Sequence, residues 1–117
     1  MRDFRDYAIW IQGIQLAVKT YELSKLLPDE ERYGLRSQIT RAVVSIPSNI
    51  AEGCSRGDKE FKRFLEMALG SAFELETQLI LIELIGLIES ELIHGIMPQL
   101  HQEQKQINSL ISKIKGR

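Results

Sequence analysis

The clearest structural signal in this 117-residue chain is the stretch from Leu35 to Arg56, LRSQITRAVVSIPSNIAEGCSR. At 100° per residue its large apolar side chains fall on one narrow face, as in an amphipathic helix. That face consists of Leu35, Ile39, Val43, Ile46 and Ile50. Pro47 interrupts the pattern and costs roughly 3 kcal/mol relative to alanine, because it lacks a backbone donor and its ring meets the carbonyl of Val43. We therefore predict a helix that tertiary packing holds together and that bends at Pro47.

The composition indicates one globular domain that spans residues 1–117. Hydrophobic residues make up 44% of the chain and charged residues 26%, and the formal net charge is −1, which argues against a basic surface over the whole domain. The single cysteine, Cys54, cannot form an intrachain disulfide, which suits a reducing, cytoplasmic location. The N-terminus lacks the apolar run of a signal peptide. The longest apolar stretch, residues 79–88, is too short to span a membrane and contains Glu83.

Three further helices are predicted, over about residues 6–26, 58–85 and 90–114, and no segment has a strand pattern. We expect Asp58 to cap the third helix, Gly86 to end it, and Gly53 and Gly57 to take left-handed conformations between the second and third helices. The expected core face of the first helix consists of Tyr7, Ile11, Ile14, Val18 and Tyr21. That of the third helix consists of Phe61, Phe64, Leu65, Ala68, Ala72, Leu75, Leu79 and Ile82. Short connections favour antiparallel neighbours, so the predicted fold is all-α, an antiparallel up-down four-helix bundle with a proline-kinked second helix.

The end of the third helix is apolar on nearly all sides between residues 79 and 88. One side of each helix in a four-helix monomer faces water, so this surplus predicts self-association. The candidate interface residues are Ile80, Leu81, Leu84 and Ile88. Alternatively, the fourth helix and the N-terminal segment cover them within one chain.

Three motifs carry a family resemblance: PxxERYGL at residues 28–35, SIPSNIAEG at residues 45–53, and ELET at residues 74–77. The chain resembles the 23S rRNA-intervening-sequence proteins, also called S23 ribosomal proteins. The resemblance implies a bacterial, cytosolic four-helix bundle that assembles into a ring, with a pentamer as the expected size, and it implies no established activity. A related bundle, the accessory variability protein of diversity-generating retroelements, binds nucleic acid through a basic ring surface. Thr40 and Leu69 stand where many family members have arginine, which weakens a nucleic-acid role carried over from such relatives.

Polar residues of the second and third helices form two candidate sites. Arg41, Asn49, Glu52 and Glu74 are predicted to form a structural polar network between helices or subunits; the alternatives are a ligand site and solvated surface. Residues 32–63 carry seven cations and three acids, whereas residues 64–104 carry seven acids and no Lys or Arg. This asymmetry favours either complementary helices packed side by side or a local basic surface that binds RNA or DNA weakly. The nucleic-acid candidates are Arg41, Arg56, Lys59, Lys62 and Arg63.

The sequence predicts no catalytic, cofactor-binding or metal-binding residue. Glu91 and His94 have the spacing of a di-iron ligand pair, but such sites need the motif twice, and Pro98 stands where His101 would need a glutamate. No phosphate loop, nucleophile elbow or Ser/His/Asp arrangement is visible. We therefore expect a non-enzymatic scaffold or adaptor whose partner is itself, in a homo-oligomeric ring. The alternative is an RNA- or DNA-binding accessory protein that uses the basic surface of its second and third helices. Neither a membrane nor a small-molecule substrate is an expected partner.

Overall fold

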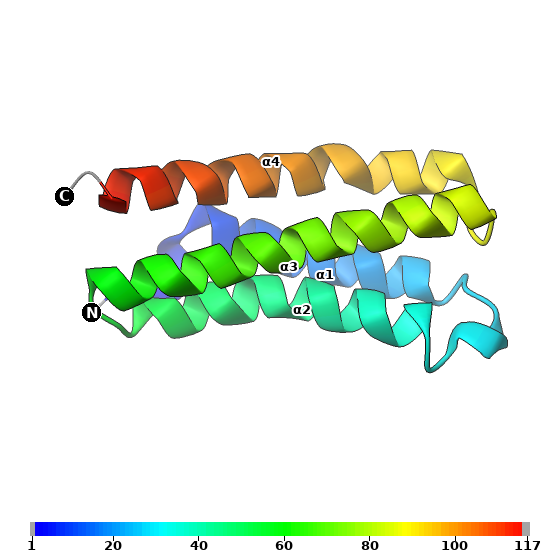
Figure 1. Cartoon of the computed structure of the whole chain (residues 1–117), viewed down its shortest axis with the longest axis horizontal. Coiled ribbons are helices and arrows are strands. Elements are labelled where there is room, and N and C mark those ends of the chain that lie inside the picture. Colours follow the sequence, from blue (N-terminus) through cyan, green and yellow to red (C-terminus); the bar gives the residue numbers. More distant parts are fainter. Residues whose placement is uncertain (1, 116–117) are drawn as a thin grey trace.

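The computed structural model describes residues 2–115, which form four long α-helices and two short 3₁₀ turns (Figure 1). The α-helices are α1 (Ala8–Ser24), α2 (Leu35–Cys54), α3 (Asp58–Ile85) and α4 (Ser90–Lys115), and the 3₁₀ turns are η1 (Phe4–Asp6) and η2 (Asp29–Glu31). Residues 2–115 contain no strand. The prediction of an all-α four-helix fold is confirmed. None of these helices is long and apolar enough to cross a membrane.

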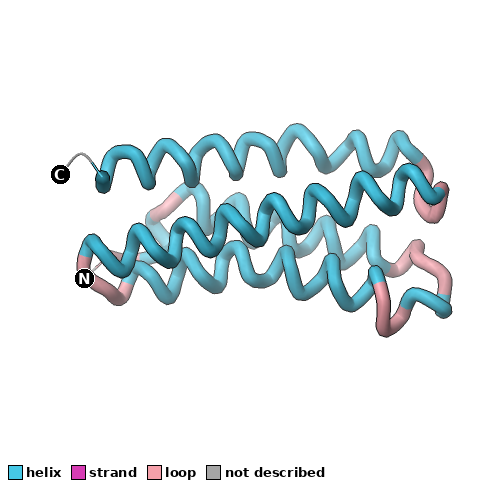
Figure 2. Tube along the Cα trace, in the orientation of Figure 1, coloured by secondary structure: helices cyan, strands magenta, loops and turns pink. Residues whose placement is uncertain are grey.

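The four helices lie side by side in a rod of 45 × 22 × 19 Å, with the loops at its two ends (Figure 2). Successive helices run in alternating directions, as the colours of Figure 1 show. Each helix packs against its neighbours in sequence, and α1 also packs against α4. Within residues 2–115, α1 and α3 are not neighbours. These two helices therefore occupy diagonal positions, and their outer sides face in opposite directions.

The α2 helix continues through Pro47, which is buried against α1. A Cβ atom built on Gly13 of α1 would lie 3.2 Å from the Cβ atom of Pro47. Glycine thus lets the two helices approach closely where the proline ring projects from α2. Packing across this contact stabilises α2 and offsets the destabilisation caused by its interior proline. The bend at Pro47 stays a prediction.

The ends of α3 confirm one prediction and contradict two. Gly86 ends α3 in the left-handed conformation at φ 86°, as expected, because glycine has no Cβ to clash there. Asp58 is the first helical residue and not the cap; Gly57 occupies the cap position, and the Asp58 carboxylate pairs with Arg2. The expectation for Gly53 and Gly57 is wrong, since Gly86 is the only residue with positive φ in the described chain.

The core confirms the predicted faces of α2 and α3, because every apolar side chain assigned to them from the sequence is buried. The predicted face of α1 is wrong for four of its five residues, since Ile11, Ile14, Val18 and Tyr21 are exposed, whereas Tyr7 is half-buried and packs against the core. The buried residues of α1 are Ile9, Gly13, Leu16, Thr20, Leu23 and Ser24. Both sets recur at helical spacing, so α1 carries two apolar faces, and only the face with Gly13 allows the close approach of Pro47.

Candidate functional site

The outer side of α1 carries a row of apolar side chains, called the α1 stripe: Ile11, Ile14, Val18 and Tyr21. Their exposed fractions are 45%, 39%, 55% and 49%. Spacings of three, four and three residues place them on one face of the helix over a length of about 15 Å. None of the other helices covers this face. The stripe is therefore an apolar surface that one chain leaves in contact with water.

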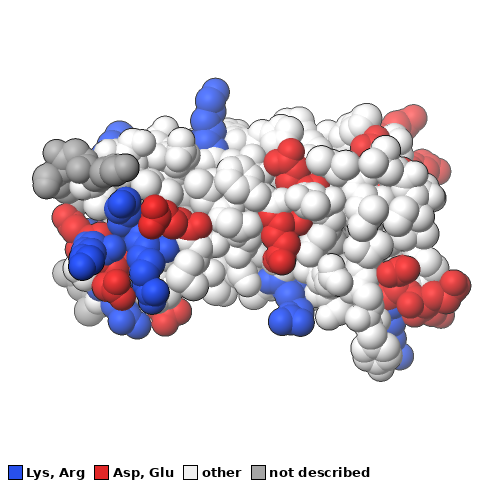
Figure 3. Space-filling model, in the orientation of Figure 1, with Lys and Arg blue, Asp and Glu red and all other residues white. Residues whose placement is uncertain are grey.

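A second row, called the α3 stripe, consists of Leu69, Phe73, Ile80 and Leu84. Leu69 is half-buried, and the other three are 51%, 42% and 79% exposed. Spacings of four, seven and four residues place them on one helix face over about 22 Å. The outer side of α3 faces the viewer in Figure 1, and uncharged surface predominates along much of that face in Figure 3.

The predicted interface residues divide between the surface and the core. Ile80, Leu81 and Leu84 are exposed. Ile88 is 5% exposed and packs in the core of its own chain, so it is not available to a second copy. Ile88 follows the turn after α3, where the chain folds back towards α4. The alternative that the chain covers its own surplus apolar residues thus holds for Ile88 and not for the other three.

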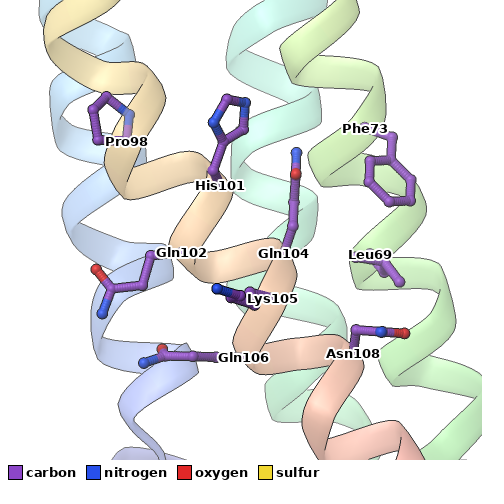
Figure 4. Close-up of a pocket in the computed structure, with 9 residues that line it drawn as sticks. All are labelled: Leu69, Phe73, Pro98, His101, Gln102, Gln104, Lys105, Gln106 and Asn108. Carbon is purple, nitrogen blue, oxygen red and sulfur yellow. The ribbon is translucent and has the colours of Figure 1, made fainter.

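An open groove of about 940 Å³ extends along the outer side of α4, from the α3 stripe towards α1 (Figure 4). Its lining residues are Leu69 and Phe73 from α3, and Pro98, His101, Gln102, Gln104, Lys105, Gln106 and Asn108 from α4 (Figure 4). At its edge, Glu76 accepts hydrogen bonds from Gln104 (2.7 Å) and pairs with His101 (3.1 Å). The Gln104 hydrogen bond, and then His101, lower the pKa of Glu76 against the opposing effect of burial. These contacts fasten α4 to α3 and fix the walls of the groove.

The four residues of the predicted polar network do not join within one chain. Arg41 and Glu74 line the same hollow between α2 and α3, but no ion pair connects them among residues 2–115. Asn49 donates to the Ser45 carbonyl of its own helix (2.8 Å). Glu52 pairs with Arg56 one turn along α2 (3.5 Å), and both side chains are about half exposed. A network between subunits stays a prediction.

The predicted nucleic-acid residues form a cluster of four and one separate residue. Arg56, Lys59, Lys62 and Arg63 follow one another where α2 turns into α3, whereas Arg41 lies more than three helical turns away. Figure 3 shows Lys and Arg at that end of the molecule, interspersed with Asp and Glu. The pairs Arg56–Glu52 (3.5 Å) and Arg63–Glu60 (3.6 Å) offset part of the charge. The cluster is thus less basic than the sequence suggests.

Sequence reasoning missed the buried carboxylate of Glu103. Its side chain is 0% exposed; one oxygen accepts a hydrogen bond from Gln12 of α1 (2.9 Å), and the other has no partner in the described chain. Burial raises the pKa of Glu103 to about 7, against the opposing effect of the Gln12 hydrogen bond. Glu103 lies three residues after Leu100 and four before Ile107, both fully buried. That spacing is the signal that could have placed it in the core.

His94 and Cys54 are the residues to weigh for metal and thiol chemistry, and the structure shows the surroundings of both. His94 pairs with Glu83 of α3 (2.7 Å), and within residues 2–115 no three His, Cys, Asp or Glu side chains gather as a metal site would require. Cys54 is buried, and burial raises the pKa of its thiol although Arg2 lowers it. A buried thiol with a raised pKa is a poor nucleophile.

Comparison with known proteins identifies a family and similar solved structures. The model of the family described as 23S rRNA-intervening sequence protein matches residues 5–109. A protein of unknown function from the S23 ribosomal protein family of Bacteroides thetaiotaomicron VPI-5482 is 27% identical, with a TM-score of 0.83 over 89% of this chain and 98% of that one. None of the curated proteins matches the chain.

Proposed function

This chain belongs to the family of 23S rRNA-intervening sequence proteins, and we propose that it is a non-enzymatic scaffold or adaptor that assembles into a homo-oligomeric ring. The motif SIPSNIAEG and the two shorter motifs at residues 28–35 and 74–77 indicate the same family from the sequence. The pentameric size and the cytoplasmic location belong to this proposal. A single buried cysteine suits a reducing compartment.

The observation that carries the proposal is the exposed α1 stripe. Fully burying a Val, Leu, Ile or Phe side chain is worth about 1.5–3 kcal/mol. The four α1 side chains are between 39% and 55% exposed, so each would gain part of that amount on association. Monomeric proteins rarely leave contiguous apolar patches of more than a few hundred Å² in water. A second copy of the chain would remove this surface, and that of the α3 stripe, from water.

Light scattering after size exclusion, with the absorbance ratio recorded, tests the proposal. We expect a mass that is a multiple of the 13.4 kDa chain. Val18→Asp should release monomers with unchanged helical circular dichroism, because a carboxylate would enter an apolar contact. Ser112→Asp adds the same charge at an exposed position of α4 and should leave the mass unaltered. A monomeric wild-type protein at micromolar concentration would refute the proposal.

A second candidate function is binding of RNA or DNA by the cluster where α2 turns into α3. Lys59 and Lys62 have no acidic partner in the described chain, which leaves two cations for phosphates. A fluorescently labelled RNA, titrated at low and high salt, tests this function, since phosphate contacts weaken steeply with salt. Lys59→Gln combined with Lys62→Gln should reduce the affinity and its salt dependence. Absence of binding at low salt eliminates this function.

A further inference from the structure

We propose that successive copies join head to tail, with the α1 stripe of one copy docked along the α3 stripe of the next. The occupant of each stripe is a second copy of this chain. This inference rests on the proposed self-assembly and adds which two surfaces meet. It also gives the assembly a direction, because each copy contacts one neighbour through α1 and the other neighbour through α3.

The positions of the two helices favour this pairing over a symmetric one. Since α1 and α3 lie on a diagonal of the bundle, their outer faces point in opposite directions. A two-fold contact joins the same patch of both copies. It would cover α1 with α1 and leave the α3 stripe in water, or the reverse. A contact between unlike faces covers both stripes of every copy with one kind of interface, and such contacts generate rings when the rotation closes.

The sizes of the surfaces lead to the same pairing. A single contact uses four stripe side chains from each partner in either arrangement, but a head-to-tail assembly removes all eight stripe side chains of every copy from water, whereas α1 against α1 removes only four. The α3 stripe of about 22 Å is also long enough for the α1 stripe of about 15 Å.

The shape and charge of the receiving face fit a helix ridge. Leu69 and Phe73 belong both to the α3 stripe and to the lining of the α3–α4 groove. A helix laid along α3 would therefore border this recess on its α4 side. The amide of Asn108, on the α3 side of α4, offers hydrogen bonds to a partner (Figure 4). The eight stripe side chains are uncharged. Glu76 lies on the same face of α3 between Phe73 and Ile80, and it is already paired with His101 and Gln104, so docking there buries no unpaired charge.

Mixing two assembly-deficient variants tests the pairing. Val18→Asp places a charge in the α1 stripe and leaves the α3 stripe intact. Phe73→Asp places a charge in the α3 stripe and leaves the α1 stripe intact. Each variant alone should be monomeric in a head-to-tail assembly, because every contact needs both faces. An equimolar mixture should form a 1:1 heterodimer with twice the 13.4 kDa mass, since one intact pair of faces remains. Native mass spectrometry distinguishes this heterodimer by the masses of the two variants.

Three outcomes separate this inference from the proposed function. If either variant alone forms dimers, or if the mixture stays monomeric while the wild type assembles, the pairing of α1 with α3 is overturned and self-assembly stands. If the wild type is monomeric, both are overturned. Leu84→Asp is a second variant of the α3 stripe, at a position whose side chain is 79% exposed in one chain. It should behave like Phe73→Asp in the mixture, and circular dichroism verifies that all variants keep their helices.

Discussion

The buried carboxylate of Glu103 should make the bundle less stable as the pH rises from about 4.5 to 7, and Glu103→Gln should abolish this loss. The side chain is 0% exposed, and burial raises its pKa from the ordinary 4.5 to about 7. A raised pKa means that the folded chain binds the proton more tightly than the unfolded chain does. The stabilising contribution of the proton is therefore complete below pH 4.5 and is lost as the pH rises through 7.

The size of the effect follows from the difference between the two pKa values. A rise from 4.5 to about 7, at 1.36 kcal/mol per pKa unit, corresponds to a loss of about 3 kcal/mol between the two ends of the range. That is a large part of the roughly 5–15 kcal/mol by which domains are stable. Glutamine has nearly the same size, can accept the hydrogen bond from Gln12, and carries no charge at any pH. Glu103→Gln should therefore raise the stability at pH 8 and change it little at pH 4.5.

Urea unfolding followed by circular dichroism measures the effect, at several pH values between 4.5 and 8. The protein concentration is held constant, because assembly also contributes to apparent stability. Glu76→Gln is the matched control. Its Gln104 hydrogen bond and His101 lower the pKa of Glu76, so its contribution is present above the ordinary pKa of 4.5 and is lost as the pH falls. Equal pH dependence of the wild type and Glu103→Gln between pH 4.5 and 7 would refute the reasoning.

Two further predictions concern side-chain packing and surface charge. Gly53→Ala should lower the stability by about 1–3 kcal/mol, because its new Cβ would come 2.7 Å from that of Phe64. A Cβ atom on Gly70 would meet nothing within 4 Å, so Gly70→Ala should raise the stability by up to about 1 kcal/mol. Thermal unfolding compares the two variants, and equal shifts of their melting temperatures would contradict this packing. Glu52→Ala should change the stability by less than about 0.5 kcal/mol, since its pair with Arg56 is exposed. A loss of several kcal/mol in urea unfolding would instead place that carboxylate inside an assembly.

The sequence predicted the helices and the core faces of α2 and α3 correctly. Each of these two faces is a long row of apolar residues at helical spacing, and the polar residues of α2 mark its opposite side. Gly86 was predictable as the end of α3 because a left-handed cap favours glycine. Such features depend on neighbours within one or two turns, so they can be read from the chain without its partners.

The core face of α1 and the burial of Glu103 depended on the packing of other helices. Helical spacing fits both apolar faces of α1, and the buried face is the one where Gly13 admits Pro47 of α2. Glu103 of α4 faces the neighbouring α1, where Gln12 donates a hydrogen bond to one of its oxygens. The polar residues Arg41 and Glu74 reach the same hollow without pairing. Periodicity along a chain thus specifies which segments are helices, whereas contacts between residues far apart in sequence select the side of each helix that is buried and the side that remains for a partner.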